Sequence, residues 1–288
     1  NPIRTPNLLF NAMLLLDYLN VDYEVVGGPG ACCGIIQSKW EGNQGKAEKV
    51  VDGTINRFAG FQPKEVLSWC PSCVLHLGET MSGFRSASFD FDHVTNYLVE
   101  RAEGLSKKFI QPINKRVLLH THDGMDEVGQ NVADLLRSVP GLTLVDLVSE
   151  PGYTCGGSGA DRSPALKQVA RRKTVARAEA DDVDVLVSLY HGCHGQLAGL
   201  QTEAKFEVLN WTDILVQALG QQPYDDVNKR YRMQSDWDMV LDEGEIFLKA
   251  NGIHMEREWL KGLLPDIFGQ TEFKGGLEEF ACGREAAE

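Results

Sequence analysis

The chain has 288 residues, 43% of them hydrophobic, and a formal net charge of −13 with a pI near 5. This length is enough for two domains that each have a core. Nucleic acid and anionic membrane surfaces would repel so acidic a protein, which excludes them as its main partners. No apolar run reaches the roughly 18 residues that span a bilayer, because Asn11 and Asp17 interrupt even the stretch at residues 8–19.

Predicted helices and strands alternate along the chain, and the pattern repeats once. The segment at residues 29–34 aligns with the segment at residues 151–156, and a helix followed by a strand precedes each. This alternation predicts an α/β fold of two similar domains, with parallel sheets flanked by helices. The domains are predicted at residues 1–108 and 109–220, with a helical C-terminal extension at 221–288. In chain order, the predicted helices cover residues 8–19, 128–139, 241–250 and 255–264, and the predicted strands cover residues 23–26, 66–69, 116–120, 142–147 and 183–189.

Four of the seven cysteines form one frame in the first half. Cys32 and Cys33 stand side by side before Gly34, and Cys70 and Cys73 follow as a Cys-x-x-Cys unit at the end of a predicted strand. Adjacent cysteines do not easily form a disulfide with each other, and the Cys-x-x-Cys unit adds two more thiolates within a few ångströms. The frame therefore predicts a metal–sulfur site that holds an iron–sulfur cluster or zinc.

Two other interpretations of these cysteines stay open. Buried free thiols can pack as small hydrophobic side chains. Alternatively, Cys70 and Cys73 could act as a thioredoxin-like pair, which would leave the adjacent pair unexplained. Ligand cysteines, an odd cysteine count and the absence of a visible signal peptide all favour a reducing cytoplasm over a secreted disulfide framework.

Several neighbours of the cysteines have expected roles. The glycine-rich turns let the backbone approach a bulky cofactor, and Gly34 is a cofactor-binding candidate. These turns do not have the lysine of a phosphate-binding loop. His76 is a candidate proton source on the helix that leaves the first site. Trp69 is expected in the core, with shielding of a cluster as a secondary role. Cys282 has no partner at a ligand spacing and is expected to be a free thiol.

The frame resembles the duplicated cysteine-rich CCG domain of the B-type subunit of heterodisulfide reductases. Relatives of this family occur in sulfur-oxidising systems and in some succinate, glycolate and lactate oxidoreductases. The resemblance covers about residues 1–220 and implies a noncubane 4Fe-4S cluster with a further cysteine ahead of the adjacent pair. In this chain that position falls before Asn1, so the sequence is expected to lack its natural start. Without that cysteine, the four present could hold an ordinary four-ligand centre.

The second half departs from the family motif at three positions. When the family motif is aligned with the second half, His122 stands where the leading cysteine is expected. Thr154 and Cys155 stand where the adjacent cysteine pair is expected. Tyr190 and Cys193 then stand at the Cys-x-x-Cys unit. Two thiolates and one imidazole with an open fourth position suit zinc, and the alternative is a dead site kept for packing. The candidates for a fourth ligand are His120, Asp123, His191 and His194, although a histidine that flanks a ligand, as His191 and His194 do, more often forms a hydrogen bond beside the site than binds the metal.

The resemblance implies chemistry on a disulfide or a protein-bound sulfane sulfur, with Cys32, Cys33, Cys70 and Cys73 as both cluster ligands and catalytic residues. The cluster would relay electrons and bind the substrate sulfur. The implied partners are a flavin-containing A-type protein and a ferredoxin-like C-type protein, in a heterodisulfide-reductase-like complex of the sulfur-oxidation type. The alternatives are an electron-relay component of a flavin dehydrogenase complex and a zinc-stapled scaffold. An open cavity that joins Cys32 and Cys33 to Cys155 and Cys193 would distinguish a reductase from a relay, which does not require one.

Overall fold

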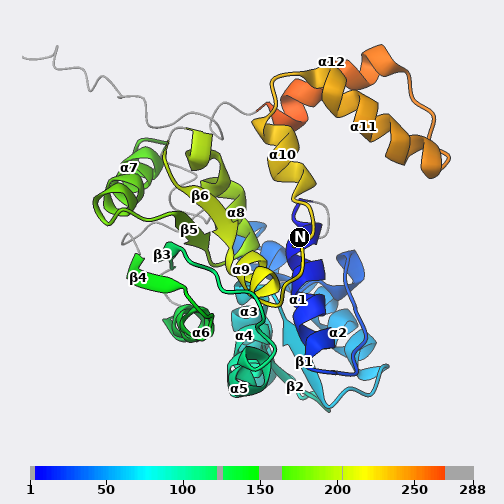
Figure 1. The fold of residues 1–288 in the computed structure, drawn as a ribbon. Helices are drawn as coiled ribbons and strands as arrows, with labels where there is room; N and C mark the ends of the chain where they lie inside the picture. The colour runs from blue at the N-terminus through cyan, green and yellow to red at the C-terminus, as the bar shows by residue number, and fades with distance from the viewer. Residues whose placement is uncertain (1–3, 122–125, 149–163, 203, 270–288) are drawn as a thin grey trace, which may run out of the picture.

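The computed structural model describes residues 4–121, 126–148, 164–202 and 204–269. All of its strand pairs are parallel, and they form two sheets. The duplicated α/β fold with a helical C-terminal extension is therefore confirmed (Figure 1). The strands are β1 (Glu65–Ser68), β2 (Asp90–His93), β3 (Arg116–His120), β4 (Thr143–Val148), β5 (Val185–Ser188) and β6 (Glu207–Asn210).

Helices connect and cover the strands, and each predicted helix is present with slightly different ends. The helices of the first half are α1 (Pro6–Tyr18), η1 (Pro29–Ala31), the π-helical turn η2 (Ile36–Trp40), α2 (Gln44–Ala59), α3 (Pro71–Gly83), α4 (Val94–Glu100) and α5 (Ala102–Ser106). Those of the second half are α6 (Asp126–Arg137), α7 (Pro164–Ala180), α8 (His191–Leu197), η4 (Ala198–Thr202) and α9 (Trp211–Ala218). The extension holds α10 (Val227–Met233), α11 (Trp237–Ala250) and α12 (Arg257–Phe268).

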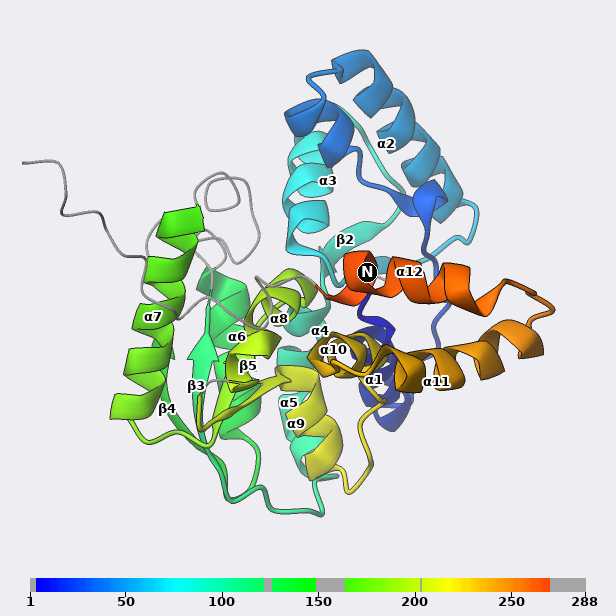
Figure 2. The same cartoon turned by 90° about the horizontal axis from the view of Figure 1, so that it is seen from above.

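The larger sheet belongs to the second half and has the strand order β4-β3-β5-β6. Its central strands are apolar because both faces are covered, as parallel sheets require. Helices α6 and α9 pack together against one face, and α7 lies on the other side of the sheet (Figure 2). From β3 the chain first adds β4 on one side and then crosses back to add β5 and β6 on the other side, so the strand order switches between β3 and β5. Ligands of such folds bind beyond the carboxyl ends of the strands at this switch point. His120 and Ser188 end these two strands, and both are fully buried.

The smaller sheet has only β1 and β2, and the predicted strand at residues 23–26 is wrong. That segment has no regular secondary structure and joins neither sheet, and Val25 is 63% exposed. In the second half, β4 pairs with β3, which in turn pairs with β5. Among the described residues of the first half, no strand lies in the place that β3 takes, so residues 23–26 have no neighbour that could supply backbone hydrogen bonds.

Two hydrophobic cores lie beneath the two sheets. The larger core surrounds β3 to β6 and also takes in Leu15 of α1, Leu98 of α4 and Leu105 of α5, so it crosses between the halves. The smaller core consists of residues from α2, α3 and the first sheet, and it includes Cys33. Figure 2 shows α2 and α3 as a separate lobe beside the larger sheet. The predicted domain boundaries remain predictions.

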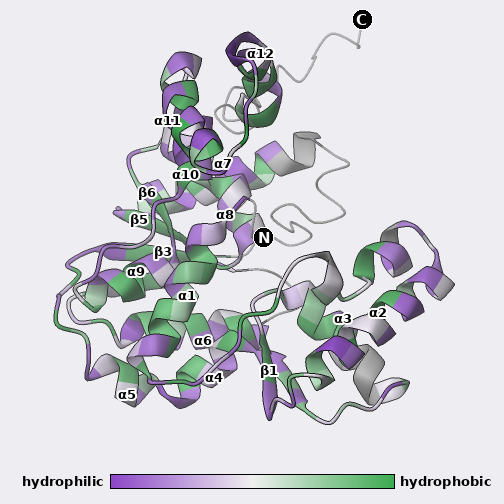
Figure 3. Ribbon diagram, turned by 90° about the vertical axis from the view of Figure 1, so that its right-hand side faces the viewer, coloured by the Kyte–Doolittle hydropathy of each residue, from purple (hydrophilic) through white to green (hydrophobic). Residues whose placement is uncertain are grey.

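The C-terminal extension is a group of three helices, of which α10 contacts η4 while α11 and α12 project from the rest of the molecule (Figure 3). Tyr231, Val240, Leu241 and Leu264 give it a small core of its own. Ion pairs link its helices, including the pair of Arg230 with Glu243. Of the helices in the described part of the chain, none has the length and apolarity needed to cross a membrane.

Candidate metal centre

The adjacent cysteines lie on a short loop that α2 fixes in place. Cys32 directly follows η1, and its carbonyl accepts a hydrogen bond of 2.6 Å from Thr54 Oγ1 of α2. Gly34 has a φ of +77°, and a Cβ on this residue would lie 3.0 Å from the Ala47 carbonyl oxygen. Glycine is needed here for both reasons. In this structure the backbone at Gly34 comes close to α2, and this close packing holds Cys33 in the smaller core.

The Cys-x-x-Cys unit lies where β1 passes into α3. Cys70 directly precedes the helix, and Ser68 Oγ accepts a hydrogen bond of 3.1 Å from its backbone N–H. Cys73 lies in the first turn, and its backbone N–H donates to the Cys70 carbonyl at 3.0 Å. The unpaired N–H groups and the dipole of a helix N-terminus stabilise negative charge, so this position favours thiolates.

The thiols of Cys33, Cys70 and Cys73 form one hydrogen-bonded group with Cys73 in the middle. Hydrogen bonds to its two neighbours, together with burial, raise the pKa of Cys73, which therefore keeps its proton. The hydrogen bond from Cys73 lowers the pKa of Cys33. The same kind of bond, assisted by the backbone N–H groups of Cys73 and Ser72, lowers the pKa of the Cys70 thiol to about 6. The group thus combines one retained proton with two easily formed thiolates.

These thiols suit an iron–sulfur cluster or zinc by their chemistry, because both take soft thiolate ligands. The structure joins three of the four predicted ligands, and Cys32 stands next to Cys33 but outside the hydrogen-bonded group in the described part of the chain. Cys73 forms a hydrogen bond with each of the other two thiols. Among the described residues, no three His, Cys, Asp or Glu side chains are arranged to hold a metal ion. Metal binding would require the thiols to turn toward a common centre.

Aromatic residues connect the segment that holds Cys70 to the second half. Trp69, directly before Cys70, stacks on Trp211 with ring centroids 5.4 Å apart. His93 Nε2 lies 3.2 Å from the Trp69 carbonyl oxygen, and burial lowers the pKa of His93 to about 4, so its imidazole is neutral. The expected place of Trp69 in the core is confirmed. His76 lies on α3 one turn after Cys73 and is 8% exposed, so a proton there would be shielded from solvent.

The second predicted site is described only in part. His122, Asp123, Thr154 and Cys155 lie outside the described residues, as does Cys282. Cys193 lies in the first turn of α8, where it is 2% exposed and occupies the place that Cys73 has in α3. His191 begins this helix, and burial lowers its pKa to about 4. The ligand set of His122, Cys155 and Cys193 therefore stays a prediction.

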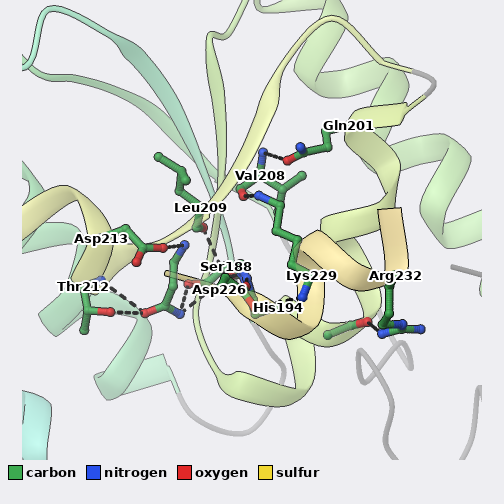
Figure 4. Close-up of polar contacts among 12 residues, drawn as sticks. Ser188, His194, Gln201, Val208, Leu209, Thr212, Asp213, Asp226, Lys229 and Arg232 are labelled. Atoms are coloured by element: carbon green, nitrogen blue, oxygen red, sulfur yellow. Dashed lines mark hydrogen bonds and ion pairs between the residues drawn. The ribbon is translucent and has the colours of Figure 1, made fainter. Parts of the chain in front are cut away.

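His194 belongs to a buried polar network that the sequence did not reveal (Figure 4). Its Nδ1 lies 3.0 Å from Ser188 Oγ, and its Nε2 lies 2.6 Å from an oxygen of Asp226. Asn210 donates to the carbonyl and the hydroxyl oxygen of Ser188, and it caps α9 in a capping box with Asp213. With both ring nitrogens engaged, His194 is held as a structural residue. Asp226 lies 32 residues away in a charged segment, and no local pattern marks it.

Comparison with known proteins gives one family. The family model described as the cysteine-rich domain, CCG, matches residues 4–78 and residues 120–198. The two matches cover more than half of the chain, and each contains one Cys-x-x-Cys unit or its remnant. No curated protein matches the chain.

Proposed function

The chain belongs to the cysteine-rich CCG domain family, and on this premise we propose that it acts on a disulfide or a protein-bound sulfane sulfur. Family membership with two domain copies indicates an oxidoreductase-type protein that binds a metal or an iron–sulfur cluster. The finer proposal is a component of a heterodisulfide-reductase-like complex in which Cys32, Cys33, Cys70 and Cys73 hold a 4Fe-4S cluster of the noncubane type. A zinc ion on His122, Cys155 and Cys193 is part of the same proposal.

The observation that carries the proposal is the contact among Cys33, Cys70 and Cys73. Segments separated by 36 residues bring their thiols together at a helix N-terminus, and two of the thiols have lowered pKa values. Burying thiols that ionise easily costs free energy unless a cation or hydrogen bonds compensate. A bound iron–sulfur cluster would supply that compensation, together with electrons delivered one at a time and an iron atom that can bind sulfur.

Other residues of the chain would support this chemistry. Reduction of a disulfide consumes two electrons and two protons and yields two thiols. His76, one helical turn after Cys73 and nearly buried, is the proposed local source of a proton. The stacking of Trp69 on Trp211 connects the segment that precedes Cys70 to the second half. The electrons would come from partner proteins of the flavin-containing and ferredoxin-like types.

Anaerobic purification of the full-length protein, with iron, acid-labile sulfide and zinc measured together, tests the proposal. We expect about four irons and four sulfides per chain and a brown protein. Cys33→Ser and Cys73→Ser should lose most of the iron, whereas Cys193→Ser should keep the iron and lose any zinc. The wild-type protein, reduced chemically and mixed with a disulfide, should be reoxidised as thiols form. A colourless protein that contains zinc alone would refute the cluster and leave a zinc-stapled scaffold.

A further inference from the structure

The hairpin of α11 and α12 ends in a tip that exposes large apolar side chains. The tip comprises residues 246–259, which form the last turn of α11, the connection and the first turn of α12. Its apolar side chains are each between 43% and 67% exposed, and they belong to Ile246, Phe247, Ile253, Met255 and Trp259. Five of the sixteen exposed large hydrophobic side chains of the described residues thus gather on a short segment that projects from the rest of the molecule (Figure 3).

The hairpin does not need these side chains for its own packing. Arg257 at the start of α12 forms ion pairs with Asp242 at 2.8 Å and with Glu245 at 2.9 Å, and these pairs tie the two helices together beside the tip. The small core of the extension takes residues from all three helices but none of the five apolar side chains of the tip. Exposed apolar side chains that gather in one place in this way mark a contact site for another molecule.

The charges around the tip indicate what kind of molecule fits. Between residues 238 and 261 the chain has six acidic and three basic side chains. All three basic ones, Lys249, Arg257 and Lys261, form ion pairs within the hairpin. Glu256 and Glu258, next to Met255 and Trp259, form no ion pair in the described part of the chain. The tip therefore combines an apolar surface with negative charge that the hairpin leaves uncompensated.

We propose that the tip is a docking surface for another protein, whose matching surface is apolar and bordered by lysine and arginine side chains. Complementary charges at the border speed association and select the partner. A tryptophan among apolar neighbours, as Trp259 is, is the kind of residue that dominates the energy of such contacts. A second copy of the chain would bring its own carboxylates against Glu256 and Glu258, and an anionic membrane would be repelled in the same way.

The docking surface contains none of the cysteines, so docking can fail or hold independently of the proposed function. The probe is a labelled synthetic helical peptide that presents leucine on one face and lysine on the other. Its binding to the full chain is measured by fluorescence anisotropy. A second peptide with glutamate in place of lysine should bind at least about tenfold more weakly.

Variants of exposed residues locate the contact without disturbing a core. Phe247→Ser should weaken binding of the lysine peptide by about tenfold, because it removes an apolar side chain from the tip. Phe84→Ser is the matched control, because Phe84 is also exposed but follows α3 in the other lobe, and it should leave the affinity unchanged. Replacing Glu256 and Glu258 together by glutamine should weaken binding several-fold and reduce its dependence on salt.

Binding that requires Phe247 and the two glutamates but not Phe84 supports the docking surface. Equal affinities of the wild type and Phe247→Ser, with circular dichroism showing that both are folded, would overturn it, as would equal binding of the two peptides. Three further results would assign the tip to a different occupant and so also overturn the proposal. These are a dimer in sedimentation velocity that Phe247→Ser abolishes, binding to phosphatidylglycerol vesicles that Phe247→Ser abolishes, and peptide binding only by a chain that ends at residue 269.

Discussion

The two halves place their Cys-x-x-Cys position in the same way but on sheets of different size. In both, a strand ends in serine, and the motif follows at the start of a helix: Ser68 precedes α3, and Ser188 precedes α8. In both, the next strand ends opposite that serine in a polar residue that caps the following helix. This residue is His93 in the first half and Asn210 in the second. The pair of neighbouring strand ends, and not the whole sheet, therefore positions the motif.

The halves differ in what occupies the first position of the motif. Cys70 in the first half offers a thiol at the start of α3, whereas Tyr190 takes the corresponding place before α8. The Tyr190 ring is buried and meets the His93 ring edge-on, with centroids 6.0 Å apart. A position that is a proposed ligand in the first half thus serves packing between the halves in the second. The two halves share their strand ends and helix starts while differing in the residue at this position.

The largest effect is expected from breaking the cap in the second half with Asn210→Ala. Asn210 is fully buried, donates to Ser188 and Leu189, and accepts from Thr212. Its loss leaves several buried polar groups without partners and should lower the free energy of unfolding by about 4 kcal/mol. Urea unfolding measures this change. Asn56→Ala, at an exposed position of α2, is the control and should change stability by less than about 0.5 kcal/mol.

The next prediction concerns His93, the helix cap of the first half, and its replacement by asparagine, the residue that caps the helix in the second half. Burial lowers the pKa of His93 from 6.5 to about 4, so the unfolded chain takes up the proton first as the pH falls. The stability contributed by the neutral imidazole is fully present above pH 6.5 and is lost between pH 6.5 and about 4, by about 3 kcal/mol. His93→Asn supplies the cap of the other half without a titrating group. The variant should therefore lack that part of the slope.

The measurement for this prediction is the free energy of unfolding at several pH values between about 4 and 7. His191 also has a pKa lowered to about 4, so a slope remains in the variant. The quantity to compare is the difference between the curves, and His254→Gln at an exposed position serves as the control. Parallel curves for the wild type and His93→Asn would contradict a buried neutral imidazole at this position.

The elements that sequence alone predicted well are those with local signals. Helical periodicity placed α1 and α6 within a few residues of their ends, and apolar runs placed β3 and β5. The spacing of the cysteines predicted that their thiols lie close together, and three of them form a hydrogen-bonded group, whereas the metal site itself stays a prediction. Each of these signals lies within one element or one motif, so a single sequence is enough to read it.

The features that sequence alone missed depend on distant partners. Residues 23–26 have the composition of a strand, but a strand also needs a neighbour, and composition does not show whether one is present. Asn11 donates to Asp213 across 202 residues, and His194 meets Asp226 across 32. No periodic pattern links such pairs. Likewise, a small pocket beside α8 is lined by residue 4 and by residues 228–232, which only the fold brings together.

A smaller effect is expected from Gly34→Ala, which disturbs the loop of the adjacent cysteines. Alanine would adopt a φ of +77° with its Cβ 3.0 Å from the Ala47 carbonyl oxygen, so the two penalties together should cost about 2 kcal/mol. Gly42→Ala is the matched control, because Gly42 has a φ of +65° with open space around it, and it should cost only about 1 kcal/mol. Urea unfolding of both variants gives the comparison. Equal losses would mean that α2 yields to the added methyl group and does not fix the loop.

The smallest effect is expected from Gly53→Ala in α2, the helix that corresponds to α7 of the second half. Helix α2 contains Gly53 in its interior, whereas α7 contains no glycine. A Cβ at Gly53 would meet no atom within 4 Å, so Gly53→Ala should raise the free energy of unfolding by about 0.5 to 1 kcal/mol. The gain should appear as a higher urea midpoint with an unchanged slope. A loss of stability would mean that the surface of α2 at Gly53 is needed for a contact that an alanine side chain blocks. In that case α2 and α7 would differ in what they contact and not only in their glycine content.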